Sequence, residues 1–229
     1  MRTLIYVPVI HMSADLGSIA KAVNKRGIAG FGEEFWKKHR DTVSGFWDTI
    51  TDYFSSIKVT ERKIYQDGMV ADKEVGEKII EEGIKSGSKN YELLSRLLKR
   101  GVILVKTEDF NLVKEERDRI VKITQAKTTV GKLAGFIRYK LAKNRLLKKR
   151  DSFIAKRIDE TLNQGETGIL FIGAYHNIKT RLLKDIQIIE VKDTDKVREY
   201  QRLLLFHARN KSRFEELGKY LISPINLTV

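Results

Sequence analysis

The stretch from residue 150 to residue 176 constrains the fold of this chain more than any other. It begins with an apolar stripe at helical spacing, formed by Phe153, Ile154, Ile158 and Leu162. Gly165 follows where a helix commonly ends. Residues 168–172 are then continuously apolar, which is typical of a short strand that is covered on both faces. This order of helix, turn and buried strand predicts one unit of an α/β fold.

Four further apolar runs have the length of a strand and are separated by helical patterns: residues 4–10, 63–66, 102–105 and 186–191. Strands that alternate with helices indicate βαβ units and a largely parallel sheet. We therefore predict one α/β domain over residues 1–229, with a mostly parallel central sheet flanked by helices. Pro8 weakens the first run, and we expect it at a sheet edge or a bulge.

The helical patterns cover residues 15–23, 33–57, 73–86, 91–100, 110–125 and 195–211, together with a segment that starts at Thr128 or Thr129. We expect Asp72 and Asn90 to cap two of these helices, and residues 27–32 to form a glycine-rich connector. The aromatic face of residues 33–57 predicts a core-facing helix. In the segment after Thr129 the apolar stripe is interrupted by polar residues. Either that helix breaks near Asn144, or its face looks into a wet cavity around Arg150 and Asp151.

Polar side chains stand at the ends of four predicted strands: His11, Asp67, Glu108 and His176. In a parallel sheet the carboxyl ends of the strands share one rim, where ligands bind. Two imidazoles and two carboxylates there could hold a divalent metal ion with an open coordination position. Structural roles compete with this interpretation, because Asp67 could form an Asx-turn with Gly68 and Glu108 could be a charge at a helix N-terminus.

The order of an Arg-Asp pair, an apolar helix, a turn and a strand that ends in Gly-x-x-His resembles a pattern of the TraB/TIKI/ChaN-like (EreA/ChaN-like) superfamily. The chain is similar to an uncharacterised prokaryotic member of that group. The family has Arg-Asn where this chain has Arg150 and Asp151, and its second Gly-x-x-His matches Gly173 to His176. Its N-terminal Gly-x-x-His corresponds to residues 8–11 here, where proline replaces the glycine before His11. The resemblance covers about 27 residues specifically.

This resemblance implies a site made of both motif histidines, an acidic residue and an arginine. Some members look like metal-dependent peptidases, others hydrolyse esters, and many have no assigned activity. We accordingly expect His11, His176 and Asp67 to bind the metal ion. Arg150 and Glu108 would be catalytic, with Arg150 stabilising negative charge that develops on the substrate.

The composition excludes several classes of protein. There is no cysteine, so disulfides, thiolate metal sites and thiol nucleophiles are ruled out, and a cytoplasmic location is favoured. No apolar run approaches the roughly 20 residues that span a membrane. The short apolar run at the N-terminus leads into His11 and Asp15, and we interpret it as a strand and not as a signal peptide.

The net charge of +14 is concentrated in residues 128–157, which hold ten basic residues and a single acidic one, Asp151. Such a segment is usually a solvated helix face, but it also fits a polyanion. The sequence thus leaves two functions open. The favoured one is a cytoplasmic metal-dependent hydrolase with a small-molecule or peptide substrate. The alternative is a non-enzymatic protein that binds nucleic acid through residues 128–157.

Overall fold

The computed structural model describes residues 1–12, 14–15, 20–125 and 128–227. Its centre is a parallel sheet in the order β3-β2-β4-β1-β5. The strands are β1 (Arg2–Val9), β2 (Lys63–Gln66), β3 (Ile103–Val105), β4 (Thr167–Gly173) and β5 (Ile186–Glu190). The predicted α/β fold with a mostly parallel sheet is confirmed, and each of the five predicted strands belongs to this one sheet.

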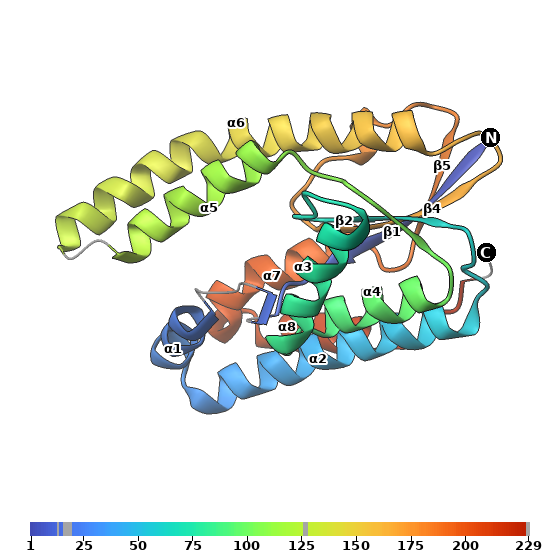
Figure 1. Cartoon of the computed structure of the whole chain (residues 1–229). Helices are drawn as coiled ribbons and strands as arrows, with labels where there is room; N and C mark the ends of the chain where they lie inside the picture. The colour runs from blue at the N-terminus through green and yellow to red at the C-terminus, as the bar shows by residue number, and fades with distance from the viewer. Residues whose placement is uncertain (13, 16–19, 126–127, 228–229) are drawn as a thin grey trace.

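Helices cover both faces of the sheet and make a three-layer arrangement (Figure 1). The described helices are α1 (Ala20–Phe31), α2 (Glu33–Ser56), α3 (Lys73–Lys85), α4 (Lys89–Lys99), α5 (Phe110–Gln125), α6 (Thr129–Thr161), α7 (Thr194–Leu203) and α8 (Lys211–Leu221), with short 3-10 turns η2 (Lys179–Arg181) and η3 (Leu204–Arg209). The C-terminal half of α6 packs on one face through Ile154, Ile158 and Leu162. Helices α2, α4, α7 and α8 pack on the other face.

The aromatic residues of α2 belong to the larger of the two core clusters, as their spacing predicts. Trp47 and Phe54 are fully buried. The Trp47 ring stacks on Phe171 of β4 at a centroid distance of 6.3 Å, and the Phe54 ring lies tilted against Phe171 at 5.5 Å. The described part of the chain contains no helix that is long and apolar enough to cross a membrane.

Pro8 lies in an inner strand and not at the sheet edge that we predicted. On one side it is paired with Ile172 of β4. On the other side the pairing with β5 ends at Tyr6, so the sheet needs no amide hydrogen from residue 8. The proline is therefore tolerated because the neighbouring strand is short.

Of the two predicted helix caps, Asp72 stands at the N-cap position of α3, whereas Asn90 does not cap α4. The side chain of Asp72 makes no capping hydrogen bond to α3. Helix α4 begins two residues earlier than predicted, where the Ser88 hydroxyl accepts a hydrogen bond from the Tyr91 amide, and Asn90 is buried inside the helix. Serine and asparagine are both good cap residues, so the local sequence does not choose between them.

The other differences concern helix boundaries. Residues 27–31 belong to α1 and do not form a connector, because Gly27 lets α1 approach α2 closely: a Cβ atom there would lie 2.2 Å from the Trp36 ring. Part of the predicted helix 15–23, residues 16–19, lies outside the described residues. The predicted helix 195–211 is divided among α7, η3 and α8.

Helix α6 is continuous for 33 residues and does not break near Asn144. Its N-terminal half pairs with α5, and this helical hairpin projects beyond the edge at which the strands end (Figure 1). Where α6 reaches the sheet, Arg150 and Asp151 are buried and point to the rim. The interruption of the apolar stripe therefore marks a polar site beneath the helix.

Candidate functional site

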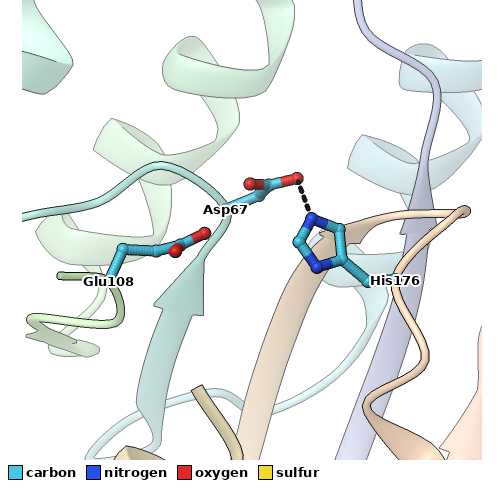
Figure 2. A group of neighbouring side chains, drawn as sticks. All are labelled: Asp67, Glu108 and His176. Atoms are coloured by element: carbon cyan, nitrogen blue, oxygen red, sulfur yellow. Dashed lines mark ion pairs between the residues drawn. The ribbon is translucent and has the colours of Figure 1, made fainter. Parts of the chain in front are cut away.

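The parallel sheet brings four predicted site residues to one rim in the order of their strands. Glu108, Asp67, His176 and His11 follow β3, β2, β4 and β1, which are consecutive neighbours in the sheet. Each side chain comes from the loop directly after its strand. Figure 2 shows Asp67, Glu108 and His176 turned toward one another above the strand ends.

Asp67 lies at the centre of the site. Its Oδ1 atom accepts a hydrogen bond of 2.6 Å from Arg150 Nη2, and its Oδ2 atom accepts one of 3.0 Å from the Gly173 amide. The same Oδ2 atom lies 3.6 Å from Nε2 of His176 and 3.6 Å from Nε2 of His11. One carboxylate oxygen thus stands between both imidazoles.

Arg150 holds three carboxylates. Besides Asp67, its guanidinium donates to both oxygens of Glu108, with an Nε–Oε2 distance of 3.0 Å, and to Glu116 Oε2 at 2.5 Å. Glu116 belongs to α5 and also accepts a hydrogen bond of 3.2 Å from the Tyr139 hydroxyl of α6. Because Glu108 is completely buried, this arginine is its counter-charge. Arg150 therefore joins the helical hairpin to the rim.

His176 is oriented by Asp151, the residue after Arg150. The distance between His176 Nδ1 and Asp151 Oδ1 is 2.6 Å, and Asp151 Oδ2 accepts a hydrogen bond of 3.0 Å from the Asn177 amide. Both side chains are buried. A proton on Nδ1 directed to this carboxylate leaves Nε2 facing Asp67, which is the arrangement usual for a metal-binding histidine.

His11 has a similar but looser environment. Its Nδ1 atom lies 3.8 Å from Asp15 Oδ2, and its side chain is 38% exposed. Asp15 is held by the Ser88 hydroxyl and by the Met12 amide, the latter at 2.7 Å. Each rim histidine therefore has Asp67 near one ring nitrogen and a second carboxylate near the other.

The charges of the site are mutually dependent. Burial opposes ionisation of Asp67, but the positive charges of His176, His11 and Arg150 hold the pKa of Asp67 well below its usual value. Burial likewise opposes protonation of His176, but Asp67 and Asp151 outweigh it and raise the pKa of His176. The pKa of Glu108 is raised, because its complete burial outweighs Arg150.

Gly173 is the residue that allows Asp67 and the histidines to come together. A Cβ atom at this position would lie 3.0 Å from Asp67 Oδ2 and 3.5 Å from His11 Nε2 and from His176 Cδ2. The first distance is tighter than ordinary van der Waals contact. A side chain at the glycine of the Gly-x-x-His pattern would therefore crowd the site in this chain.

Asp67, Glu108 and His176 form a group that could hold a metal ion, since one potential ligand atom from each lies within 4.8 Å of the others. Carboxylate oxygen and imidazole nitrogen suit zinc and related divalent ions. Within this group Glu108 is already bound on both oxygens by Arg150. Asp67 and His176 are therefore more available than Glu108 to coordinate an ion.

The chain matches no known family profile, no curated protein and no solved structure.

The structure brings all five predicted site residues, His11, Asp67, Glu108, Arg150 and His176, into one network. Their division into metal-binding and catalytic residues stays a prediction. Sequence reasoning gave no site role to three carboxylates of the network, Asp15, Glu116 and Asp151. Two signals singled out Asp151, its place on the interrupted stripe of α6 and its position in the Arg-Asp pair of the family resemblance. Nothing local distinguishes Glu116 from the other charged residues of α5.

Proposed function

We propose that this protein is a metal-dependent hydrolase whose ion is bound by His11, His176 and Asp67. The observation that carries the proposal is the position of Asp67 Oδ2, 3.6 Å from Nε2 of both histidines. Ligands at roughly 2.0–2.1 Å from a tetrahedral zinc ion are separated from one another by about 3.3 Å. The two separations between Asp67 and the histidines are close to that value. The ligand atoms that already lie within 4.8 Å of one another are those of Asp67, Glu108 and His176, so the His11 side chain must move toward His176 to complete the proposed site.

The outer residues support this ligand set. Asp151 lies on Nδ1 of His176 and Asp15 lies near Nδ1 of His11, so that each Nε2 is directed to Asp67. Arg150 neutralises Glu108 and fixes Oδ1 of Asp67, which leaves Oδ2 for the ion. The resemblance of residues 150–176 to the TraB/TIKI/ChaN-like pattern, from which this ligand set was expected, points to the same residues.

The residues of the chain then have distinct roles in hydrolysis. A bound divalent ion would lower the pKa of a water molecule and polarise a carbonyl group. The open, solvent-exposed side of His11 lets substrate approach the rim. Glu108 and Arg150 position Asp67 and keep the charge of the site balanced, and the Arg150 guanidinium also places positive charge beside the substrate.

Metal titration tests this proposal. Protein stripped with a chelator and titrated calorimetrically with Zn²⁺, Mn²⁺ or Co²⁺ should bind one ion, and ester and peptide substrates should be hydrolysed only by the loaded form. Because the pKa of His176 is raised, metal must displace a proton, so affinity should rise with pH and binding should release protons. At a hundred times Kd the ion should stabilise the protein by about 2.7 kcal/mol.

The variants His176→Ala and His11→Ala should each lose metal binding and hydrolysis while they remain folded. The matched control is His207→Phe, which removes a histidine outside the network and keeps the ring stacking on Phe35. Full metal affinity in His176→Ala would contradict the proposed ligands. Tight metal binding by the wild type without hydrolysis of any substrate would contradict the enzymatic part.

A second candidate function, binding of a nucleic acid, rests on a groove of about 760 Å³ beside α6. Its lining includes five basic side chains, all exposed: Arg145, Lys148, Lys149, Lys156 and Arg181. Among the other lysines of residues 128–157, Lys143 is half-buried, with its ammonium group 5.5 Å from the centroid of the Tyr175 ring. The Lys140 side chain lies outside the described residues.

Salt dependence separates the two functions. If the groove binds nucleic acid, affinity should fall steeply with salt, with a log–log slope of about −0.9 per phosphate contact on duplex DNA. Lys148→Gln combined with Lys149→Gln should reduce that slope by about two and leave metal binding intact. A slope unaffected by these changes would exclude the groove as the binding surface.

A further inference from the structure

A pocket of about 380 Å³ opens beside the rim, between α1, α2 and the residues that follow β1. This volume falls in the range of small-molecule sites. Most of its lining is apolar and comes from Met12, Ala14, Ala20, Val23, Trp36 and Val43. His11 lines the same pocket, so a molecule bound there lies against one of the rim histidines.

The wall of the pocket is held in place by specific contacts. The Trp36 indole donates a hydrogen bond of 2.6 Å to Asn24 Oδ1, which ties α2 to α1. Gly27 of α1 lies against the same ring, where no side chain would fit. These contacts hold the wall between α1 and α2 in place without a ligand, which reduces the ordering cost of binding.

The charged groups at the pocket have one sign. Lys21 and Arg40 are exposed, line the pocket, and make no ion pair within the described residues. No acidic side chain is found in the described lining. His39 also lines the pocket, but burial lowers the pKa of His39 to about 4, so it is neutral at pH 7. Its Nδ1 lies 3.0 Å from the Tyr200 hydroxyl.

We propose that this pocket binds an organic carboxylate with an apolar chain or ring, the apolar part against Trp36 and Val43 and the carboxylate at Lys21 and Arg40. The volume has room for roughly a dozen water-sized groups, which corresponds to a medium-chain acid. Desolvation of the apolar part supplies affinity, and the two cations select against neutral and cationic ligands. That this molecule is part of the substrate rests on the proposed hydrolase function, whereas its binding needs neither metal nor hydrolysis.

The probes are octanoate, octylammonium and 1-octanol, titrated calorimetrically into metal-stripped protein. Octanoate should bind with 1:1 stoichiometry, and octylammonium should bind at least tenfold more weakly. Replacing both Lys21 and Arg40 by Gln should weaken octanoate binding roughly three- to tenfold, because exposed ion pairs contribute a few-fold each. The same change should leave 1-octanol binding within about twofold.

The matched control is the double variant Lys25→Gln and Lys37→Gln, which removes two exposed charges from the same two helices outside the pocket lining. It should bind octanoate like the wild type. Octanoate should also change the fluorescence of Trp36, and this change should be missing in Trp36→Phe, which leaves Trp47 as the remaining tryptophan.

His176→Ala distinguishes failure of this inference from failure of the proposed function. If both hold, this variant loses metal and keeps octanoate. Octanoate binding without any metal binding in the wild type would overturn the hydrolase and leave the pocket assignment standing. Absence of saturable octanoate binding, or equal loss in the Lys21/Arg40 and Lys25/Lys37 variants, would overturn the pocket assignment.

Discussion

Arg150 offers the most direct test of how the rim is held together, and the perturbation is Arg150→Met. Methionine keeps much of the volume of the side chain and removes the guanidinium. Glu108 is 0% exposed and Arg150 is 8% exposed, so this change leaves a buried carboxylate without its counter-charge. It also removes the hydrogen bond of 2.6 Å to Asp67 and that of 2.5 Å to Glu116.

The expected cost is about 3–5 kcal/mol of unfolding free energy at pH 7, the usual penalty for breaking a buried ion pair from one side. The cost should shrink as pH falls. Burial already raises the pKa of Glu108. Without Arg150 the carboxyl group avoids the cost of a buried, unpaired negative charge by taking up a proton. Adding Glu108→Gln to Arg150→Met should therefore restore part of the lost stability at pH 7.

The assay is urea denaturation at pH 7 and pH 5, followed by tryptophan fluorescence in the presence of a chelator. The matched control is Arg145→Met, an exposed arginine on the same helix, which should change stability by no more than about 0.5 kcal/mol. A cost for Arg150→Met that equals that of the control would refute the role of Arg150 as counter-charge. A cost that is independent of pH and is not relieved by Glu108→Gln would refute the electrostatic explanation.

Three further predictions concern the packing around the rim and the pocket. Gly173→Ala should lower metal affinity by roughly tenfold or more in calorimetric titration, because the new Cβ atom crowds Asp67 Oδ2. The control Gly30→Ala should leave metal affinity unchanged, because Gly30 has open space around it. The depressed pKa of His39, about 4, means that wild-type stability falls as pH drops from about 6.5 toward 4, because only the unfolded chain takes up the proton in that range. His39→Gln should remove up to about 3 kcal/mol of that pH dependence, measured by urea denaturation. If the unfolding free energies of the variant and the wild type change equally with pH, His39 is not the cause. Tyr6→Phe should leave the unfolding free energy unchanged or raise it by up to about 1 kcal/mol, since the buried Tyr6 hydroxyl has no hydrogen-bond partner among the described residues. A decrease of more than about 1 kcal/mol would show that the hydroxyl has a partner.

The class of fold follows from the local pattern of the sequence. Short apolar runs separated by helical stripes can be buried only in a sheet with helices on both faces, and such sheets are largely parallel. The strand ends followed from the same local pattern, since the apolar run stops where the polar residue begins. With a parallel sheet assumed, His11, Asp67, Glu108 and His176 had to lie along a common edge.

The order of the strands and the partners of each site residue are visible only in the folded structure. β4 lies between β2 and β1 although it follows them by about a hundred residues or more, and this places His176 directly beside Asp67. Strand order depends on which apolar faces pack best over the whole chain, and periodicity within one segment carries no information about it.

The same reason explains the residues that sequence reasoning missed or misplaced. Asp151 orients His176 and Glu116 binds Arg150 only because α6 crosses the sheet edge at one particular rotation and position. Residues 27–31 of the connector that we expected belong to α1, which packs against α2 through contact between Gly27 and the Trp36 ring. Local spacing fixes which face of a helix is apolar, whereas the partner of each polar group is fixed by distances between segments that are remote in the chain.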